Sequence, residues 1–155
     1  MERKRGKGMN NWIFLAAAAA AGVLMAIQGS LNGALGKIIG VLEGNFILHG
    51  VGLLIVAILL FLCGLGKGDL SRMGEAPWYL YLGGVINVAI IYGVMFSIAQ
   101  VGAGNATTAI IVGQLAMAML VDCFGWFGLQ QTQMTWSRGA GVLLMGLAAK
   151  LMLSK

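Results

Sequence analysis

Apolar residues gather in five long stretches, which are separated by short segments rich in glycine and polar residues. A membrane-spanning helix needs about 20 apolar residues, and such uniform runs do not suit the alternating strands of a barrel. The pattern therefore predicts an all-α integral membrane protein with five transmembrane helices. The expected spans are residues 12–35, 45–65, 78–100, 105–124 and 139–153.

The segment that precedes the first span is polar and basic. Residues 1–11 contain four lysines and arginines, and we predict that they form a disordered tail. A basic start followed by an apolar run also describes a secretory signal peptide, but four further spans favour a membrane helix. Residues 12–155 are then a single five-helix transmembrane domain, because the loops are too short to hold another domain.

Composition agrees with a protein that uses the lipid bilayer as its solvent. Hydrophobic types make up 59% of the 155 residues and charged types 10%, which is too few charges for a soluble surface or for a disordered chain. The two cysteines form no disulfide framework. No catalytic, phosphate-binding or metal-binding motif is present, so we expect no enzyme, no cofactor, no metal and no nucleic-acid partner.

The distribution of lysine and arginine predicts the orientation in the cell membrane. Five crossings put seven of these residues on the N-terminal side and three on the other, so the N-terminus is expected in the cytoplasm. Without the tail the two sides carry three each, which permits insertion in both orientations. The N-terminal side has Arg3, Lys4, Arg5, Lys7, Lys67, Arg72 and Arg138, and the opposite side has Lys37, Lys150 and Lys155.

Polar side chains within the spans are few, and a polar group in lipid needs a protein partner or a cavity. Gln28 and Asn32 are four residues apart and share a helix face. Asn87 and Gln114 lie near the middle of the third and fourth spans. These four side chains either line a substrate cavity or hold the helices together by hydrogen bonds.

Two titratable side chains flank the start of the second span. Glu43 is expected near a helix N-terminus, where it either caps the helix or exchanges a proton for a cationic substrate. His49 lies further along the same span and is either a packing residue or a proton carrier.

Gly29 and Gly33 form a G-x-x-x-G pair in the first span. Small residues at this spacing let another helix approach closely, so we assign these two glycines to helix packing.

Several segments resemble the YdcZ family of the drug/metabolite transporter superfamily. The similarity is carried by residues 26–33 (AIQGSLNG), 77–78 (PW) with 82–85 (LGGV), 101–108 (VGAGNATT) with 113–115 (GQL), 125–129 (GWFGL) and 138–139 (RG). The resemblance covers nearly all of residues 12–153. It implies a single five-helix repeat that works as an antiparallel pair, like one half of a ten-helix transporter.

A small-molecule transporter that works by alternating access as an antiparallel homodimer is therefore the favoured function, with proton coupling as a further hypothesis. Inverted repeats place the substrate site at the repeat interface, and a second, inverted copy supplies the missing repeat. Pairing with a related chain is an alternative to the homodimer. Two other functions stay open, namely a dual-topology ion channel and a non-transporting membrane subunit of a larger assembly.

Overall fold

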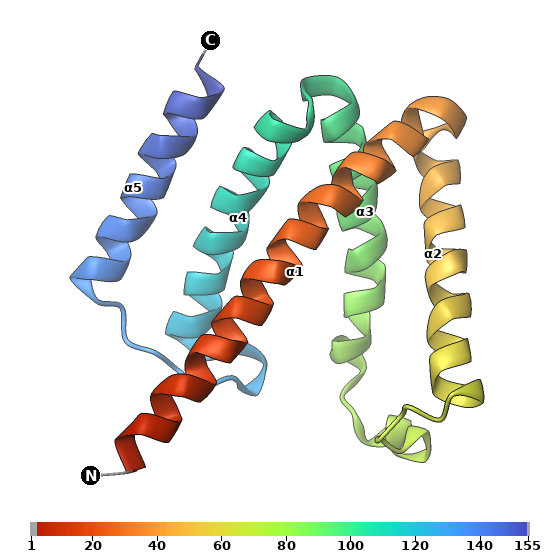
Figure 1. Ribbon diagram of the computed structural model, residues 1–155, viewed down its shortest axis with the longest axis horizontal. Helices are drawn as coiled ribbons and strands as arrows, with labels where there is room; N and C mark the ends of the chain where they lie inside the picture. Colours follow the sequence, from red (N-terminus) through yellow and green to blue (C-terminus); the bar gives the residue numbers. More distant parts are fainter. Residues whose placement is uncertain (1–2, 155) are drawn as a thin grey trace. The chain divides into compact units, whose positions relative to one another are not determined.

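A computed structural model describes the backbone of residues 3–154 and the side chains of residues 11–154 (Figure 1). The described residues form helices and no strand. Two compact units divide the chain, one up to Gln100 and one from Val101. The first unit holds α1 (Arg3–Ile39), α2 (Val41–Ala57), the π-helical η1 (Ile58–Leu62), the 3-10 helices η2 (Leu70–Glu75) and η3 (Trp78–Tyr81), and nearly all of α3 (Leu82–Val101). The second unit holds α4 (Ala103–Phe124), η4 (Trp126–Gly128) and α5 (Trp136–Leu153).

Four of these helical segments are long and apolar enough to cross a membrane, which confirms the multi-pass membrane class. They span Asn11–Ile39, Val41–Leu62, Trp78–Val101 and Ala103–Phe124. The fifth helix, α5, has 18 residues and carries Arg138 and Lys150 near its two ends. A fifth crossing by α5 stays a prediction.

Glycines with a positive φ separate consecutive helices at two places. Gly40 has a φ of 100° and Gly102 a φ of 84°, a backbone conformation that other residues rarely adopt. Each glycine precedes a new helix, and its carbonyl accepts the first helical hydrogen bond, from Gly44 and from Ala106. The second helix consequently starts at Val41, four residues earlier than residue 45, where the polar residues around Glu43 had suggested a loop.

The basic segment at the N-terminus also differs from the expected boundary. The sequence predicts a disordered tail over residues 1–11, whereas α1 begins at Arg3 and continues without a break into the apolar stretch. Adding turns to an existing helix needs no new nucleation, which gives a physical reason for this extension. The side chains of residues 1–10 lie outside the described part of the chain.

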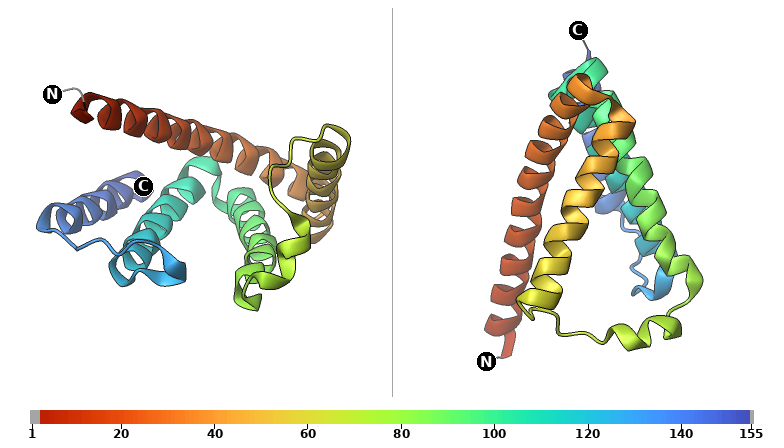
Figure 2. Two further views of the ribbon diagram at one scale, coloured as in Figure 1. Left: turned by 90° about the horizontal axis from the view of Figure 1, so that it is seen from below. Right: turned by 90° about the vertical axis from the view of Figure 1, so that its right-hand side faces the viewer.

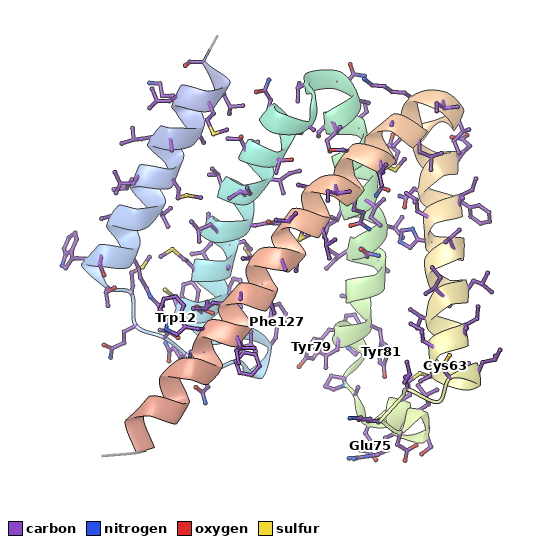
Figure 3. All side chains as sticks on the ribbon, viewed as in Figure 1. Trp12, Cys63, Glu75, Tyr79, Tyr81 and Phe127 are labelled. Carbon is purple, nitrogen blue, oxygen red and sulfur yellow. The ribbon has the colours of Figure 1, made fainter. Side chains whose placement is uncertain are left out.

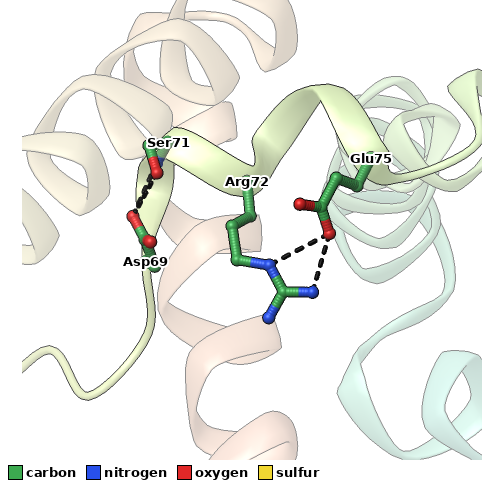
Figure 4. Close-up of polar contacts among 4 residues, drawn as sticks. All are labelled: Asp69, Ser71, Arg72 and Glu75. Atoms are coloured by element: carbon green, nitrogen blue, oxygen red, sulfur yellow. Dashed lines mark hydrogen bonds and ion pairs between the residues drawn. The ribbon is translucent and has the colours of Figure 1, made fainter.

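The connection between α2 and α3 contains the charged contacts of the first unit. In the second view of Figure 2 it lies opposite the turn between α1 and α2. Asp69 accepts hydrogen bonds from the Ser71 hydroxyl at 2.7 Å and the Ser71 amide at 2.9 Å, and both lower the pKa of Asp69 (Figure 4). Arg72 forms an exposed ion pair with Glu75 at 2.7 Å, and this carboxylate raises the pKa of Arg72.

Most of the described side chains project outward and do not pack against a neighbouring helix (Figure 3). The apolar residues that are buried within the described part of the chain are Met95, Ile98, Ala106 and Ala149. Large apolar side chains such as Phe46, which is 81% exposed, cover the outside. A surface of this kind is stable in hydrocarbon and not in water.

Candidate functional site

Polar side chains of α2 and α3 meet through two hydrogen bonds in an otherwise apolar region. The Nδ2 of Asn87 on α3 donates to the Nε2 of His49 on α2 at 3.1 Å. The Nδ1 of His49 donates to the main-chain carbonyl of Asn45 at 2.9 Å, because a carbonyl oxygen can only accept. Two residues that the sequence assigns to different roles, Asn87 to the cavity and His49 to charge coupling, are therefore in direct contact.

Asn45 is a third member of this cluster and was not among the residues singled out from the sequence. Its Nδ2 donates to the main-chain carbonyl of Val88 on α3 at 2.9 Å. The residue is 1% exposed, and its Oδ1 atom is buried with no hydrogen-bond partner among the described residues. Asn45 and His49 are four residues apart on one helix face, so the spacing that linked Gln28 to Asn32 could also have identified this pair.

A groove runs beside the cluster along α2 and α3. Its lining residues are Leu42, Asn45, Phe46, His49 and Val88, and its volume is about 270 Å³. The walls are apolar apart from Asn45 and His49. A site of this composition favours an apolar ligand that carries a small number of hydrogen-bonding groups.

Gly29 and Gly33 lie on the face of α1 that meets α3. A Cβ built on Gly29 would lie 3.0 Å from Ile98 Cδ1, and one built on Gly33 would lie 2.5 Å from Ile98 Cγ2. These distances are too short for any other residue without displacement of Ile98. At both glycines the backbone of α1 thus comes close to the side chain of Ile98.

The four proposed cavity residues lie on three helices, three of them in the first unit and one in the second. Asn87 belongs to the α2–α3 cluster, whereas Asn32 is buried on α1 with 5% exposure. Gln28 is exposed on α1, and Gln114 is exposed on α4 in the second unit. Among the described side chains, neither Gln28 nor Gln114 takes part in a hydrogen bond.

Glu43 lies in the first turn of α2 and is exposed. Its carboxylate folds back over Gly40, so closely that a Cβ on Gly40 would collide with it. Negative charge is stabilised at this end of a helix by the peptide dipoles. Among the described side chains, Glu43 and His49 are not hydrogen-bonded to each other.

Comparison with known families gives an assignment that covers most of the chain. A sequence profile described as "Putative inner membrane exporter, YdcZ" matches residues 13–151. The chain belongs to the YdcZ family. No curated protein and no solved structure gives a significant match.

Membership of the YdcZ family places the chain among membrane exporters of the drug/metabolite transporter type. Transport proteins need groups that change partners rather than groups that make and break covalent bonds. In the His49–Asn87 contact, the imidazole and the carboxamide can each both donate and accept hydrogen bonds. Among the described side chains, no three His, Cys, Asp or Glu residues come together to hold a metal ion.

Proposed function

We propose that this YdcZ-family chain exports a small molecule by alternating access, as an antiparallel homodimer coupled to proton movement through His49. The observation that carries the proposal is the hydrogen bond between His49 on α2 and Asn87 on α3. Ionisable residues within transmembrane helices are rare and commonly mark functional positions.

Protonation of His49 changes which atom must donate and which must accept in the His49–Asn87 hydrogen bond. The neutral ring donates through Nδ1 to the Asn45 carbonyl and accepts from Asn87 through Nε2. A protonated ring carries a hydrogen on both nitrogens, so Nε2 can then only donate. Asn87 would have to turn its Oδ1 atom toward the ring, or α3 would have to move. Proton binding is thereby linked to the α2–α3 interface.

Exposed amide groups within the spans support pairing with a second copy. Gln28 on α1 and Gln114 on α4 are both exposed and lie within segments long enough to cross the membrane. An amide that faces hydrocarbon lacks the hydrogen bonds that water would give it. An inverted second copy offers a partner for such groups and completes the inverted repeat that transporters of this size use.

Reconstitution of the full chain in proteoliposomes tests the proposal. A panel of small amines, neutral amphiphiles and small carboxylates is presented on one side, while uptake and internal pH are recorded together. We expect saturable uptake of at least one compound with a matching proton flux. Flux that does not saturate, and that continues at channel rates without proton movement, would contradict a carrier.

A matched pair of variants assigns the proton flux to the cluster. His49→Gln keeps a hydrogen-bonding side chain but removes the titratable ring, so uptake should lose its dependence on pH. Asn105→Ala removes an exposed amide that bonds only to the Val101 carbonyl, four residues earlier. The proton flux of Asn105→Ala should match that of the unchanged chain. Equal pH dependence in both variants would remove His49 from the mechanism.

A further inference from the structure

The α2–α3 groove contains a hydrogen-bond acceptor that has no donor among the described residues. The Oδ1 of Asn45 is buried and accepts no hydrogen bond. An unpaired carbonyl in an apolar surrounding loses the hydrogen bonds that it makes in water, so it attracts a donor. The neighbouring donors are engaged, since the Asn45 amide bonds to Val88 and the Asn87 amide bonds to His49.

We propose that this groove is a subsite for an amine, which donates N–H bonds to Asn45 Oδ1 and places a short apolar group beside Phe46. The inference rests on the proposed transport function and names its substrate class. Two observations support the proposal together: the unpaired Oδ1 atom of Asn45 and the apolar lining of the groove.

The charges on the two helices favour an ammonium over a carboxylate. Neither α2 nor α3 contains a lysine or arginine, and their acidic residue is Glu43. While the His49 ring is neutral, a bound anion would therefore have no opposite charge on either helix. An ammonium group would instead find the Oδ1 of Asn45, and it carries three N–H donors.

The walls of the groove set the size of the apolar part. Leu42, Phe46 and Val88 provide apolar surface, and the volume of about 270 Å³ suits a compact alkyl group. Leu42 is 64% exposed and Phe46 is 81% exposed, so these side chains have room to change rotamer. Their movement opens a path to Asn45, which is itself almost completely covered.

Three probes of nearly equal size separate donor chemistry from charge and bulk. Tert-butylammonium and tetramethylammonium carry the same charge and nearly the same shape, but only the first has N–H donors. Pivalate keeps the tert-butyl group and carries a negative charge. Binding to the purified full chain in lipid nanodiscs is measured by titration, with the side-chain amide signals of isotopically labelled asparagine as the second readout.

We expect tert-butylammonium to bind about tenfold more tightly than tetramethylammonium, the difference expected for one hydrogen bond to a buried carbonyl. Pivalate should bind more weakly than either cation. Asn45→Leu should abolish the preference between the two cations, whereas Asn105→Leu on α4 should preserve it. If Asn45→Leu does not fold, Asn87→Leu takes its place, and it should weaken the preference because Asn87 no longer holds the ring of His49.

Equal affinity for the two cations, or no binding of either, would overturn the amine subsite and leave water as the partner of Asn45. A preference that persists in Asn45→Leu would overturn it as well. Because this titration uses no gradient, its result is independent of transport. Uptake of another compound without amine binding would contradict the amine subsite but leave the exporter proposal standing. Amine binding without any uptake would support the subsite and contradict the exporter proposal.

Discussion

In the helix pair α2–α3, polar side chains bond to the opposite helix, whereas in the pair α4–α5 they bond chiefly to their own segment. Asn45 and Asn87 both reach across from one helix to the other. On α4, the Thr108 hydroxyl donates to the Gly104 carbonyl at 2.8 Å, and its contact with Met152 across to α5 is a weak one at 3.8 Å. Asn105 likewise bonds to the carbonyl four residues earlier.

This difference separates polar residues whose hydrogen bonds depend on the position of a neighbouring helix from those whose bonds do not. A hydroxyl that donates to a carbonyl of its own helix keeps this hydrogen bond wherever the helix lies. A carboxamide that bonds to a neighbouring helix fixes the position of that helix and responds when it moves. The α2–α3 pair is therefore where we propose that a proton or a ligand is coupled to helix movement.

Two glycines, Gly33 in the first unit and Gly146 in the second, differ in packing and give the largest expected effect. Gly33→Ala places a methyl group against Ile98, which is itself buried, and should destabilise the protein by about 1–3 kcal/mol. Gly146→Ala on α5 meets open space and should be neutral or stabilising by about 0.4–1 kcal/mol. Unfolding in detergent measures both.

The close approach of α1 to α3 can be tested further by a compensating change. Ile98→Ala removes the atoms that the new methyl group meets, so it should recover part of the stability lost in Gly33→Ala. Equal loss in Gly33→Ala and Gly146→Ala, with no recovery by Ile98→Ala, would refute the difference in packing between these two positions.

Removal of the imidazole comes next in magnitude. His49→Ala should lower proton-coupled uptake about tenfold, because Asn87 loses its cross-helix partner. Thr108→Val on α4 is the matched change, since the hydroxyl it removes bonds mainly to its own helix. Its uptake should stay within about twofold of the unchanged chain, as expected for loss of a local bond. Uptake rates in proteoliposomes measure both effects. Similar losses in the two variants would contradict the difference between the α2–α3 and α4–α5 pairs.

A smaller effect is expected at Gln114, which is exposed in the middle of α4. Gln114→Ala should reduce uptake by about threefold while leaving the dimer intact, because one amide contact to the cavity or to the second copy is lost. Uptake and chemical cross-linking are measured on the same preparation, with Gln133→Ala in the loop before α5 as the control. Unchanged uptake would make Gln114 a structural residue.

The smallest effect is expected in the loop between α2 and α3. The Ser71 hydrogen bonds lower the pKa of Asp69 in the folded state, so the stability they contribute is present at neutral pH. It is lost only as the pH falls from 3.8 through the lowered pKa of the folded state. Asp69→Asn should leave the melting temperature at pH 7 unchanged within error, because the group is fully exposed. A large shift would show that this loop supports the α2–α3 pair.

The sequence predicts the helices well and their exact ends less well. Four spans were predicted within a few residues at most ends, because long apolar runs leave little choice of structure. The start of α2 was misplaced at residue 45, because Glu43 was expected before the span, whereas Gly40 alone makes the turn. The helix through residues 3–10 was not expected either, because its residues are polar.

The candidate site could be predicted only in part. His49 and Asn87 were identified because each is polar within an apolar span, but their contact depends on how α2 packs against α3. Asn45 was overlooked because it lies close to the expected end of the span, where a polar residue needs no explanation. Its burial comes from packing, which no local pattern encodes.

Pairing of inverted copies is the central claim, and accessibility of a single thiol tests it most directly. In a chain with Cys63 and Cys123 replaced by alanine, Ser154→Cys marks the end of α5. Cells are treated with a membrane-impermeant thiol reagent, before and after the membrane is opened. The account predicts that about half of the Ser154→Cys thiols react from outside and the rest only after opening, as two opposite insertions require. Reaction of all the thiols from one side alone would contradict it.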